Sequence, residues 1–203
     1  MIERRTLLKG VGAVAALSFL GQIPALASAL TEDDIFLDED APVLGNPDGD
    51  VTMAEYFDYQ CGYCKAVHAD VMSLVEEDGN IKLLMKDWPI FGDASIYAAQ
   101  AVLGAAQIGQ YEPAMEALIT AKGRLTKTYI KMRLESAGVD MDAVAAAVNA
   151  NSGKISGLLD RNYQQAVGLR FRGTPSFIIG TTVYPGAMDR DAMKRAVEAA
   201  RKA

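Results

Sequence analysis

The chain has 203 residues, of which 50% are hydrophobic, 23% charged and 7% aromatic. This composition excludes a disordered chain, and the length is enough for one sizeable core with room for an insertion. With one histidine, two cysteines and an excess of acidic over basic residues, the chain has too few ligands for a zinc cluster and too little positive charge for a nucleic-acid surface.

Residues 1–29 have the pattern of an export signal peptide. A basic start (E-R-R-T-L-L-K) precedes an apolar run over residues 11–21, about half the ~20 residues needed to cross a bilayer. Small residues then provide A-x-A cleavage sites after Ala27 and Ala29. We therefore expect a periplasmic protein without a stable membrane anchor, with an uncleaved anchor as the alternative. The basic start resembles the twin-arginine motif, but the general secretory route remains equally open.

Residues 30–50 are predicted to form an N-terminal acidic arm. Without the first 29 residues the chain has 17 basic and 25 acidic residues, a net charge of −8. Acidic clusters lie at residues 32–34 and 38–40, and such clusters are typical of a solvated segment.

The next segment predicts a strand followed by a helix. Residues 51–59 (VTMAEYFDY) are rich in β-branched and aromatic residues and follow the turn N-P-D-G-D, which indicates a buried strand. Residues 61–77 have apolar side chains at helical spacing and end at the stop signal D-G-N. Cys61 is therefore expected at the start of a helix.

The two cysteines, Cys61 and Cys64, form a C-x-x-C motif. A c-type haem site would need His in place of Lys65, and a zinc site would need a second pair of ligands. A bridge across so short a loop would add only about 2 kcal/mol of stability. We interpret the pair as a redox-active disulfide, in which Cys61, at the positive end of the helix, attacks and the more buried Cys64 resolves.

The remaining elements continue an α/β pattern. Residues 81–90 are predicted to form a second strand, parallel to the first through a right-handed crossover. Residues 94–167 are rich in alanine and predict about four short helices, one of them capped by Asp140. Segments 176–180 and 181–184 read as a hairpin before a last helix capped by Asp189.

Three strings in this order resemble the DsbA family of thioredoxin-fold proteins, and are most similar to its branch that contains the ScsC proteins of bacterial envelopes: A-P-V-L-G-N-P-D-G-D, E-Y-F-D-Y-Q-C-G-Y-C-K and F-R-G-T-P-S-F-I-I-G. The resemblance runs from about Ile35 to the C-terminus. It implies an α/β thioredoxin fold with an α-helical insertion over residues 93–168, between a first half (51–92) that carries C-x-x-C and a second half (169–203).

The resemblance also implies roles for single residues. Cys61 and Cys64 match the attacking and resolving thiols. Thr174 and Pro175 match the cis-proline loop beside the active disulfide. Together with the intervening Gly62 and Tyr63 of the C-x-x-C motif, this loop is expected to bind substrate.

Glu55, six residues before Cys61, matches a buried acidic position beneath the active site. Strand alternation puts it on the face of Phe57 and Tyr59, and an edge-exposed carboxylate is the alternative on sequence alone. A buried carboxylate could relay the proton of the resolving thiol, with Lys86 as its partner.

Three conspicuous residues receive structural interpretations. His68 is expected to pack or be solvated rather than act as a base. Lys65 is expected to be a solvated helix residue, and Trp88 a core aromatic.

The resemblance implies a thiol:disulfide oxidoreductase that needs no metal or small-molecule cofactor. Its expected partners are exported proteins with thiols or disulfides and a membrane redox partner of the DsbB or DsbD type. Gly62, Tyr63 and Thr174 resemble disulfide isomerases of the DsbC type, but the roughly 20 residues before Val51 are too few for a dimerisation domain. We favour a monomeric dithiol oxidase, with an isomerase or reductase as the alternative. A chaperone-like binding module and a Cu(I)-handling protein are further alternatives.

Overall fold

The structure is a computed structural model that describes residues 30–203. The predicted signal peptide, residues 1–29, lies outside the described residues. Within residues 30–203, no helix has the length and apolar character required to cross a membrane.

Helices and strands alternate at both ends of the described chain, and helices alone fill its middle. In chain order they are α1 (Glu32–Phe36), β1 (Val43–Gly45), β2 (Val51–Phe57), α2 (Gly62–Asp78), β3 (Ile81–Asp87), α3 (Asp93–Ala106), α4 (Tyr111–Ile119), α5 (Lys127–Ser136), α6 (Met141–Ala150), α7 (Ser152–Gly168), β4 (Ser176–Ile179), β5 (Thr182–Pro185) and α8 (Arg190–Ala200).

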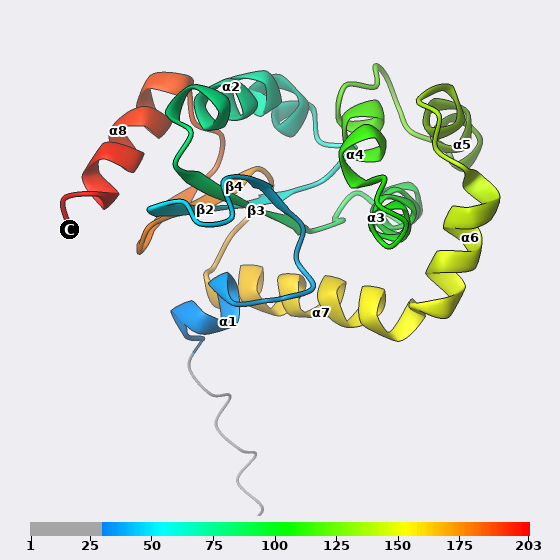
Figure 1. The fold of residues 1–203 in the computed structure, drawn as a ribbon, viewed down its shortest axis with the longest axis horizontal. Coiled ribbons are helices and arrows are strands. Elements are labelled where there is room, and N and C mark those ends of the chain that lie inside the picture. Colours follow the sequence, from blue (N-terminus) through cyan, green and yellow to red (C-terminus); the bar gives the residue numbers. More distant parts are fainter. Residues whose placement is uncertain (1–29) are drawn as a thin grey trace, which may run out of the picture.

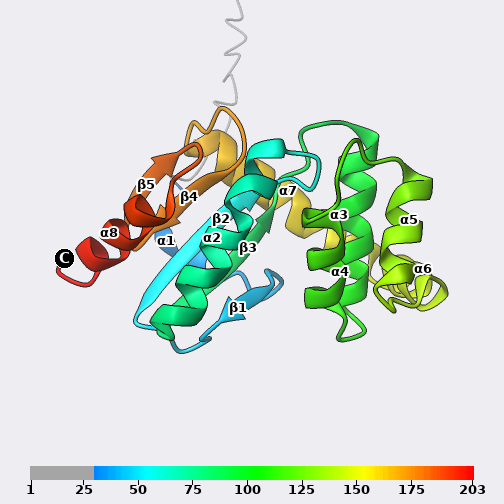
Figure 2. The same ribbon diagram turned by 90° about the horizontal axis from the view of Figure 1, so that it is seen from above.

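The strands form one five-stranded sheet in the order β1-β3-β2-β4-β5. β2 and β3 are parallel, as expected for strands joined through α2, and the other neighbours are antiparallel. Helices α2 and α8 cover one face of the sheet, and α1 and α7 cover the other (Figure 1). Helices α3 to α6 pack together beside the sheet (Figure 2). The fold is the α/β thioredoxin fold with a helical insertion that the sequence predicts.

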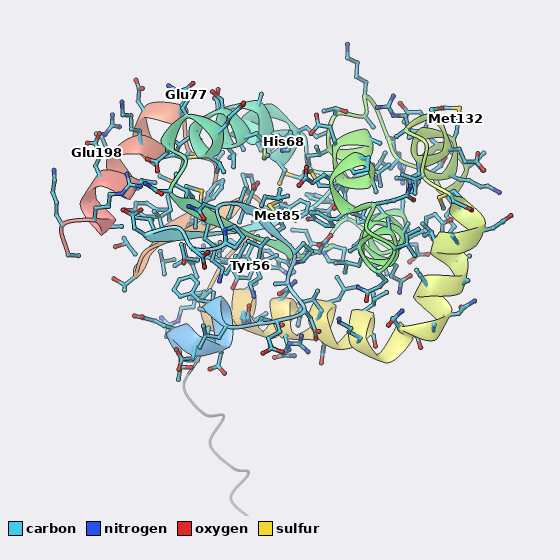
Figure 3. All side chains as sticks on the ribbon, viewed as in Figure 1. Tyr56, His68, Glu77, Met85, Met132 and Glu198 are labelled. Carbon is cyan, nitrogen blue, oxygen red and sulfur yellow. The ribbon has the colours of Figure 1, made fainter. Side chains whose placement is uncertain are left out.

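Successive side chains along each strand point to opposite faces of the sheet, so a hydrophobic core lies on each face. Phe57, Met85 and Phe177 belong to the core beneath α2 and α8, which continues into the insertion. Tyr56 and Ile178 belong to the second core, on the α7 side, where Phe171 stacks edge-on to Tyr56. Figure 3 shows Tyr56 and Met85 on opposite sides of the sheet. Side chains on one face of the central strands therefore belong to the first core, and side chains on the other face belong to the second.

The insertion contains five helices, α3 to α7, rather than about four. A single residue, Asn151, separates α6 from α7. Asp140 caps α6 through bonds from the N–H groups of Asp142 and Ala143, as predicted. Asp189 likewise caps α8.

The segment 30–50 is not the solvated acidic arm that we expected. It contains α1, which starts with a capping box, and β1, which pairs with β3. The side chain of Asp38 is only 5% exposed, and its carboxylate lies 2.8 Å from Arg161 and 3.8 Å from the buried Lys86. Burial of a lysine requires a nearby counter-ion, and this acidic segment supplies it.

Candidate active site

Cys61 occupies the N-cap of α2, where the backbone is still extended (φ −69°, ψ 119°). Its sulfur accepts a hydrogen bond from the Cys64 N–H at 3.4 Å, so it takes the place of a capping side chain. Cys61 is 3% exposed and Cys64 fully buried, and both are free thiols. The structure therefore represents the dithiol form, and the disulfide between them stays a prediction.

The two thiols differ strongly in acidity. The Cys64 thiol, the neighbouring Thr174 side chain and the N–H groups of Cys64 and Tyr63 lower the pKa of Cys61 to about 5, against the opposing effect of burial. Burial, the neighbouring Cys61 and the charge of Glu55 raise the pKa of Cys64 far above its usual range. At neutral pH Cys61 is therefore a thiolate and Cys64 a thiol.

The loop before β4 closes over Cys61. Because β4 runs antiparallel to β2, with Ser176 paired to Tyr56, the residues before Ser176 lie at the end of β2 from which Cys61 follows. The Thr174–Pro175 peptide bond is cis, and the carbonyl oxygen of Thr174 lies 3.1 Å from the Cys61 sulfur. The structure thus brings together two segments that are 113 residues apart.

Glu55 lies beneath the thiols. It is 2% exposed because β2 is the central strand, so the edge-exposed alternative does not hold. Burial, together with the nearby Cys61, raises the pKa of Glu55 to about 8. Its neighbours in register are Met85 and Phe177. A carboxyl in this position holds a proton at neutral pH.

Lys86 is not the partner of Glu55 that we expected. It pairs in register with Tyr56, one position further along, and strand alternation therefore directs its side chain to the opposite face of the sheet. There it lies near Asp38 instead.

Asp58 organises the turn before Cys61, and the sequence analysis missed it. Its carboxylate accepts hydrogen bonds from the N–H groups of Gln60 (2.7 Å), Ile90 (2.7 Å) and Phe91 (3.2 Å) and from the Ser95 hydroxyl (2.8 Å). An Asp that directly follows a buried strand is a signal for such a turn. This carboxylate joins the C-x-x-C turn to the β3–α3 loop and to the first turn of α3.

The insertion is also bonded to the residues that flank the cysteines. The Gln60 side chain accepts a bond from the N–H of Leu125 at 2.6 Å, and the Lys65 ammonium donates to the carbonyl of Ala121. Lys65 is therefore half-buried rather than solvated, and burial lowers its pKa. His68 is buried and contacts Glu116 of α4 at 2.7 Å, and Figure 3 shows it on α2 next to α4.

The surface beside Cys61 is formed by residues between and opposite the cysteines. Tyr63 is 71% exposed, and no atom lies within 4 Å of the position that a Cβ on Gly62 would take. Tyr63, Thr174 and Pro175 line a groove of about 500 Å³. The predicted site residues Cys61, Cys64, Glu55, Thr174 and Pro175 thus lie together, with Gly62 and Tyr63 at the surface.

One further prediction concerns Trp88. Trp88 is 6% exposed and packs near Phe171, as expected for a core aromatic. Within residues 30–203, no group of three or more His, Cys, Asp or Glu side chains is placed to hold a metal ion.

Comparisons with known proteins agree with this geometry. The family model described as thioredoxin matches residues 38–199. A thioredoxin-like oxidoreductase from Silicibacter pomeroyi DSS-3 is 37% identical and superposes with a TM-score of 0.82, over 86% of this chain and 99% of that one. The thiol-disulfide exchange protein α-DsbA2 from Wolbachia pipientis is 31% identical, with a TM-score of 0.77, over 82% and 90%. The catalytic domain of Proteus mirabilis ScsC, at 24% identity, shares the fold with a TM-score of 0.73, over 84% and 94%.

Curated relatives match over a smaller part of their own length. The Na⁺/H⁺ antiporter NhaA 1 of Mycolicibacterium gilvum is 24% identical over 162 residues, which are 78% of this chain and 26% of the antiporter. The antiporter of Herminiimonas arsenicoxydans is 23% identical over 79% of this chain and 25% of its own length. The chain therefore spans about a quarter of the curated relatives that it matches.

Proposed function

The chain belongs to the thioredoxin family and to its DsbA-like members, and on this premise we propose that it is a thiol:disulfide oxidoreductase that acts on exported proteins as a dithiol oxidase. One observation carries the proposal. Cys61, with a pKa lowered to about 5, lies beside Cys64, with a pKa raised far above the usual range, at the first turn of one helix.

The oxidase reaction begins with the Cys61–Cys64 disulfide. A substrate thiolate attacks the Cys61 sulfur, the Cys61–Cys64 bond breaks, and Cys64 leaves with the electron pair of that bond. A second substrate thiolate then attacks the substrate sulfur in the mixed disulfide and releases Cys61 as a thiolate. The substrate is oxidised by two electrons and the protein becomes the dithiol form seen in the structure.

Glu55 supplies the proton that Cys64 needs. A thiolate at Cys64 is a poor leaving group because burial raises its pKa. Glu55 is protonated at neutral pH, with a pKa of about 8, and its ionised form is one of the influences that raise the pKa of Cys64. We assign Glu55 as the general acid when Cys64 leaves and as the general base when the disulfide is regenerated.

The acidity of Cys61 supports oxidation over reduction. A low pKa stabilises the thiolate of the reduced protein, and a stable reduced form makes the disulfide a stronger oxidant. The dipole of α2 and the N–H groups of Cys64 and Tyr63 act in the same direction. An isomerase or reductase would use the same two thiols. The residues Gly62 and Tyr63 between the cysteines resemble those of isomerases, and we therefore retain this function as the second candidate.

Export and redox partners complete the proposal. The signal-like pattern in residues 1–29 supports a periplasmic location. There the reduced protein would be reoxidised by a membrane partner of the DsbB type, or reduced by one of the DsbD type if it acts as an isomerase.

The test compares two assays on the same purified protein. One measures oxidation of a reduced two-cysteine peptide by the disulfide form, and the other measures reactivation of a scrambled disulfide protein. We expect fast peptide oxidation, slow reactivation, and loss of both with Cys61→Ser. Rapid reactivation with slow oxidation would favour the isomerase. A Cys61 thiol that titrates near pH 8.5, as in free cysteine, would contradict the proposal.

A further inference from the structure

We propose that Arg170 and Arg172 make the groove beside Cys61 selective for substrates that carry Asp or Glu close to the reacting cysteine. The proposal rests on the proposed function and names the substrate class of the same site. Both arginines line the groove of about 500 Å³ that begins at Thr174, whose carbonyl oxygen is 3.1 Å from the Cys61 sulfur.

The groove is positively charged in an acidic protein. Arg170 and Arg172 are exposed, and neither forms a salt bridge or a side-chain hydrogen bond with any residue of the described range 30–203. Among residues 30–203, no acidic side chain lines the groove. Other arginines form ion pairs that join distant parts of the fold, for example Arg161 with Asp38 and Arg201 with Asp50. The two groove arginines are therefore available to an anionic ligand.

The backbone at Arg170 gives an independent reason to assign it a function. α7 ends in a Schellman motif, in which the N–H of Arg170 donates to Val167 at 3.0 Å and the N–H of Phe171 to Ala166 at 2.9 Å. This motif places Arg170 in the left-handed region, with φ 59°, where it is the single non-glycine residue with a positive φ among the described residues. Glycine or asparagine suits this position better than arginine. The side chain is thus present at a conformational cost, as is common at binding sites.

The lining of the groove suits an extended peptide. Besides the two arginines, it is lined by Tyr63, Pro175 and, at the end of the edge strand β5, Pro185. An extended chain advances about 3.3 Å per residue. Because the groove begins at Thr174, beside Cys61, we expect side chains one or two positions from the substrate cysteine to lie over the groove, where a carboxylate can bind a guanidinium group.

The experiment measures exchange with single-cysteine peptides that carry Asp, Asn or Lys one or two positions before or after the cysteine. The Cys64→Ser protein is first loaded at Cys61 as a mixed disulfide with 2-thiopyridine, which leaves as the uncharged thione and is a better leaving group than the Cys61 thiolate. The peptide thiol then attacks the Cys61 sulfur, the bond to 2-thiopyridine breaks, and the resulting peptide–Cys61 disulfide is followed by mass spectrometry. Each rate is divided by the rate of the same peptide with dipyridyl disulfide, which removes differences in peptide thiol pKa.

We expect Asp peptides to exceed Asn peptides by about threefold to tenfold at low salt, in line with partly exposed charge pairs. The ratio should fall to nearly one in 1 M salt, where the Debye length is about 3 Å. Arg170→Gly combined with Arg172→Gln should abolish the preference, so that Asp and Asn peptides react at the same normalised rate.

Two controls separate binding from folding. Arg195→Gln removes an exposed charge of α8 that does not line the groove, and it should keep the preference. Arg170→Gly and Arg170→Asn should leave the melting temperature unchanged or raise it, because both residues suit a positive φ.

The outcomes distinguish this proposal from the proposed function. Equal normalised rates for Asp and Asn peptides, or a preference that survives in the double variant, would overturn the role of the arginines while exchange itself continues. A protein that exchanges with none of the peptides, and that oxidises no two-cysteine peptide, would overturn the proposed function and this selectivity with it.

Discussion

Glu55 and Lys86 are buried on opposite faces of the central sheet, and the two side chains are handled in different ways. On the face covered by α2 and α8, Glu55 has a buried carboxylate oxygen without a hydrogen-bond partner and no salt bridge within residues 30–203. On the face covered by α1 and α7, Lys86 is equally buried but lies 3.8 Å from Asp38, which also binds Arg161. A buried charge with a counter-ion stabilises the arrangement around it, whereas a partnerless carboxyl beside two thiols remains free to exchange a proton.

The largest expected effect comes from breaking the pair on the α7 side. Asp38→Ala leaves the ammonium of Lys86 buried without a counter-ion and should lower the free energy of unfolding by about 3 kcal/mol. Chemical denaturation of the disulfide form measures this loss. The double variant Asp38→Ala with Lys86→Met should regain most of it, and a double variant as unstable as the single one would contradict the pairing.

The next largest effect is expected on the reaction rate at the face of the sheet that carries Glu55. Glu55→Gln removes the proton donor for Cys64 and should slow attack of a substrate thiolate on the disulfide by about 10²-fold at pH 7. Stopped-flow measurement of mixed-disulfide formation checks this rate. Lys86→Met is the matched control because its side chain lies on the opposite face, and it should leave the rate unchanged. Equal slowing by both variants would indicate a general structural effect.

The two faces should also respond to pH in opposite directions. The pKa of Glu55 is raised from about 4.5 to about 8, so the folded protein binds the extra proton and its contribution to stability is lost as pH rises from 4.5 to 8. Burial lowers the pKa of Lys86 from 10.5 to about 8, so its contribution is regained as pH rises from 8 to 10.5.

Denaturation of the disulfide form across pH measures both windows, because Cys61 does not titrate when it is bonded. Each slope approaches about 1.4 kcal/mol per pH unit at most. Glu55→Gln should reduce the slope in the lower window only, where Asp87 keeps contributing because burial also raises its pKa. Lys86→Met should reduce the slope in the upper window only. A variant that changes the slope in the other window would show that the two groups are assigned wrongly.

The smallest effect is expected for Lys86→Met by itself. It replaces a buried cation with an apolar side chain of similar length, and Asp38 keeps its bonds to Arg161. Such replacements are commonly neutral or slightly stabilising, so we expect a change within about 1 kcal/mol in thermal or chemical denaturation. A loss above about 2 kcal/mol would mean that the ammonium itself holds the N-terminal segment in place.

The comparison of the two faces also shows which features could be predicted from the sequence. β2, β3, the hairpin and the start of α2 at Cys61 were predicted because their signals are local: β-branched runs, a turn before each strand and an apolar stripe at helical spacing. Glu55 could be placed on the face of Phe57 by alternation alone. The caps at Asp140 and Asp189 are local as well.

The errors arose where distant parts of the chain decide the outcome. Asp38 is ordered by Arg161, which is 123 residues away, and no local pattern shows this. The face of Lys86 depends on the register of β3 against β2, which is fixed only once the strands pair. The anchoring role of Asp58 depends on N–H groups from the β3–α3 loop. The family resemblance, and not the residue pattern, supplied the cis-proline loop.

The two halves of the site are 113 positions apart in the chain, so they are synthesised at different times. A ribosome produces both cysteines before the insertion and long before Thr174. A chain that ends within α7 therefore carries the dithiol but lacks the carbonyl that faces Cys61 and the arginine-lined groove. Until its last segment is synthesised and packed, such a chain has reactive sulfur without the surface that selects its partners.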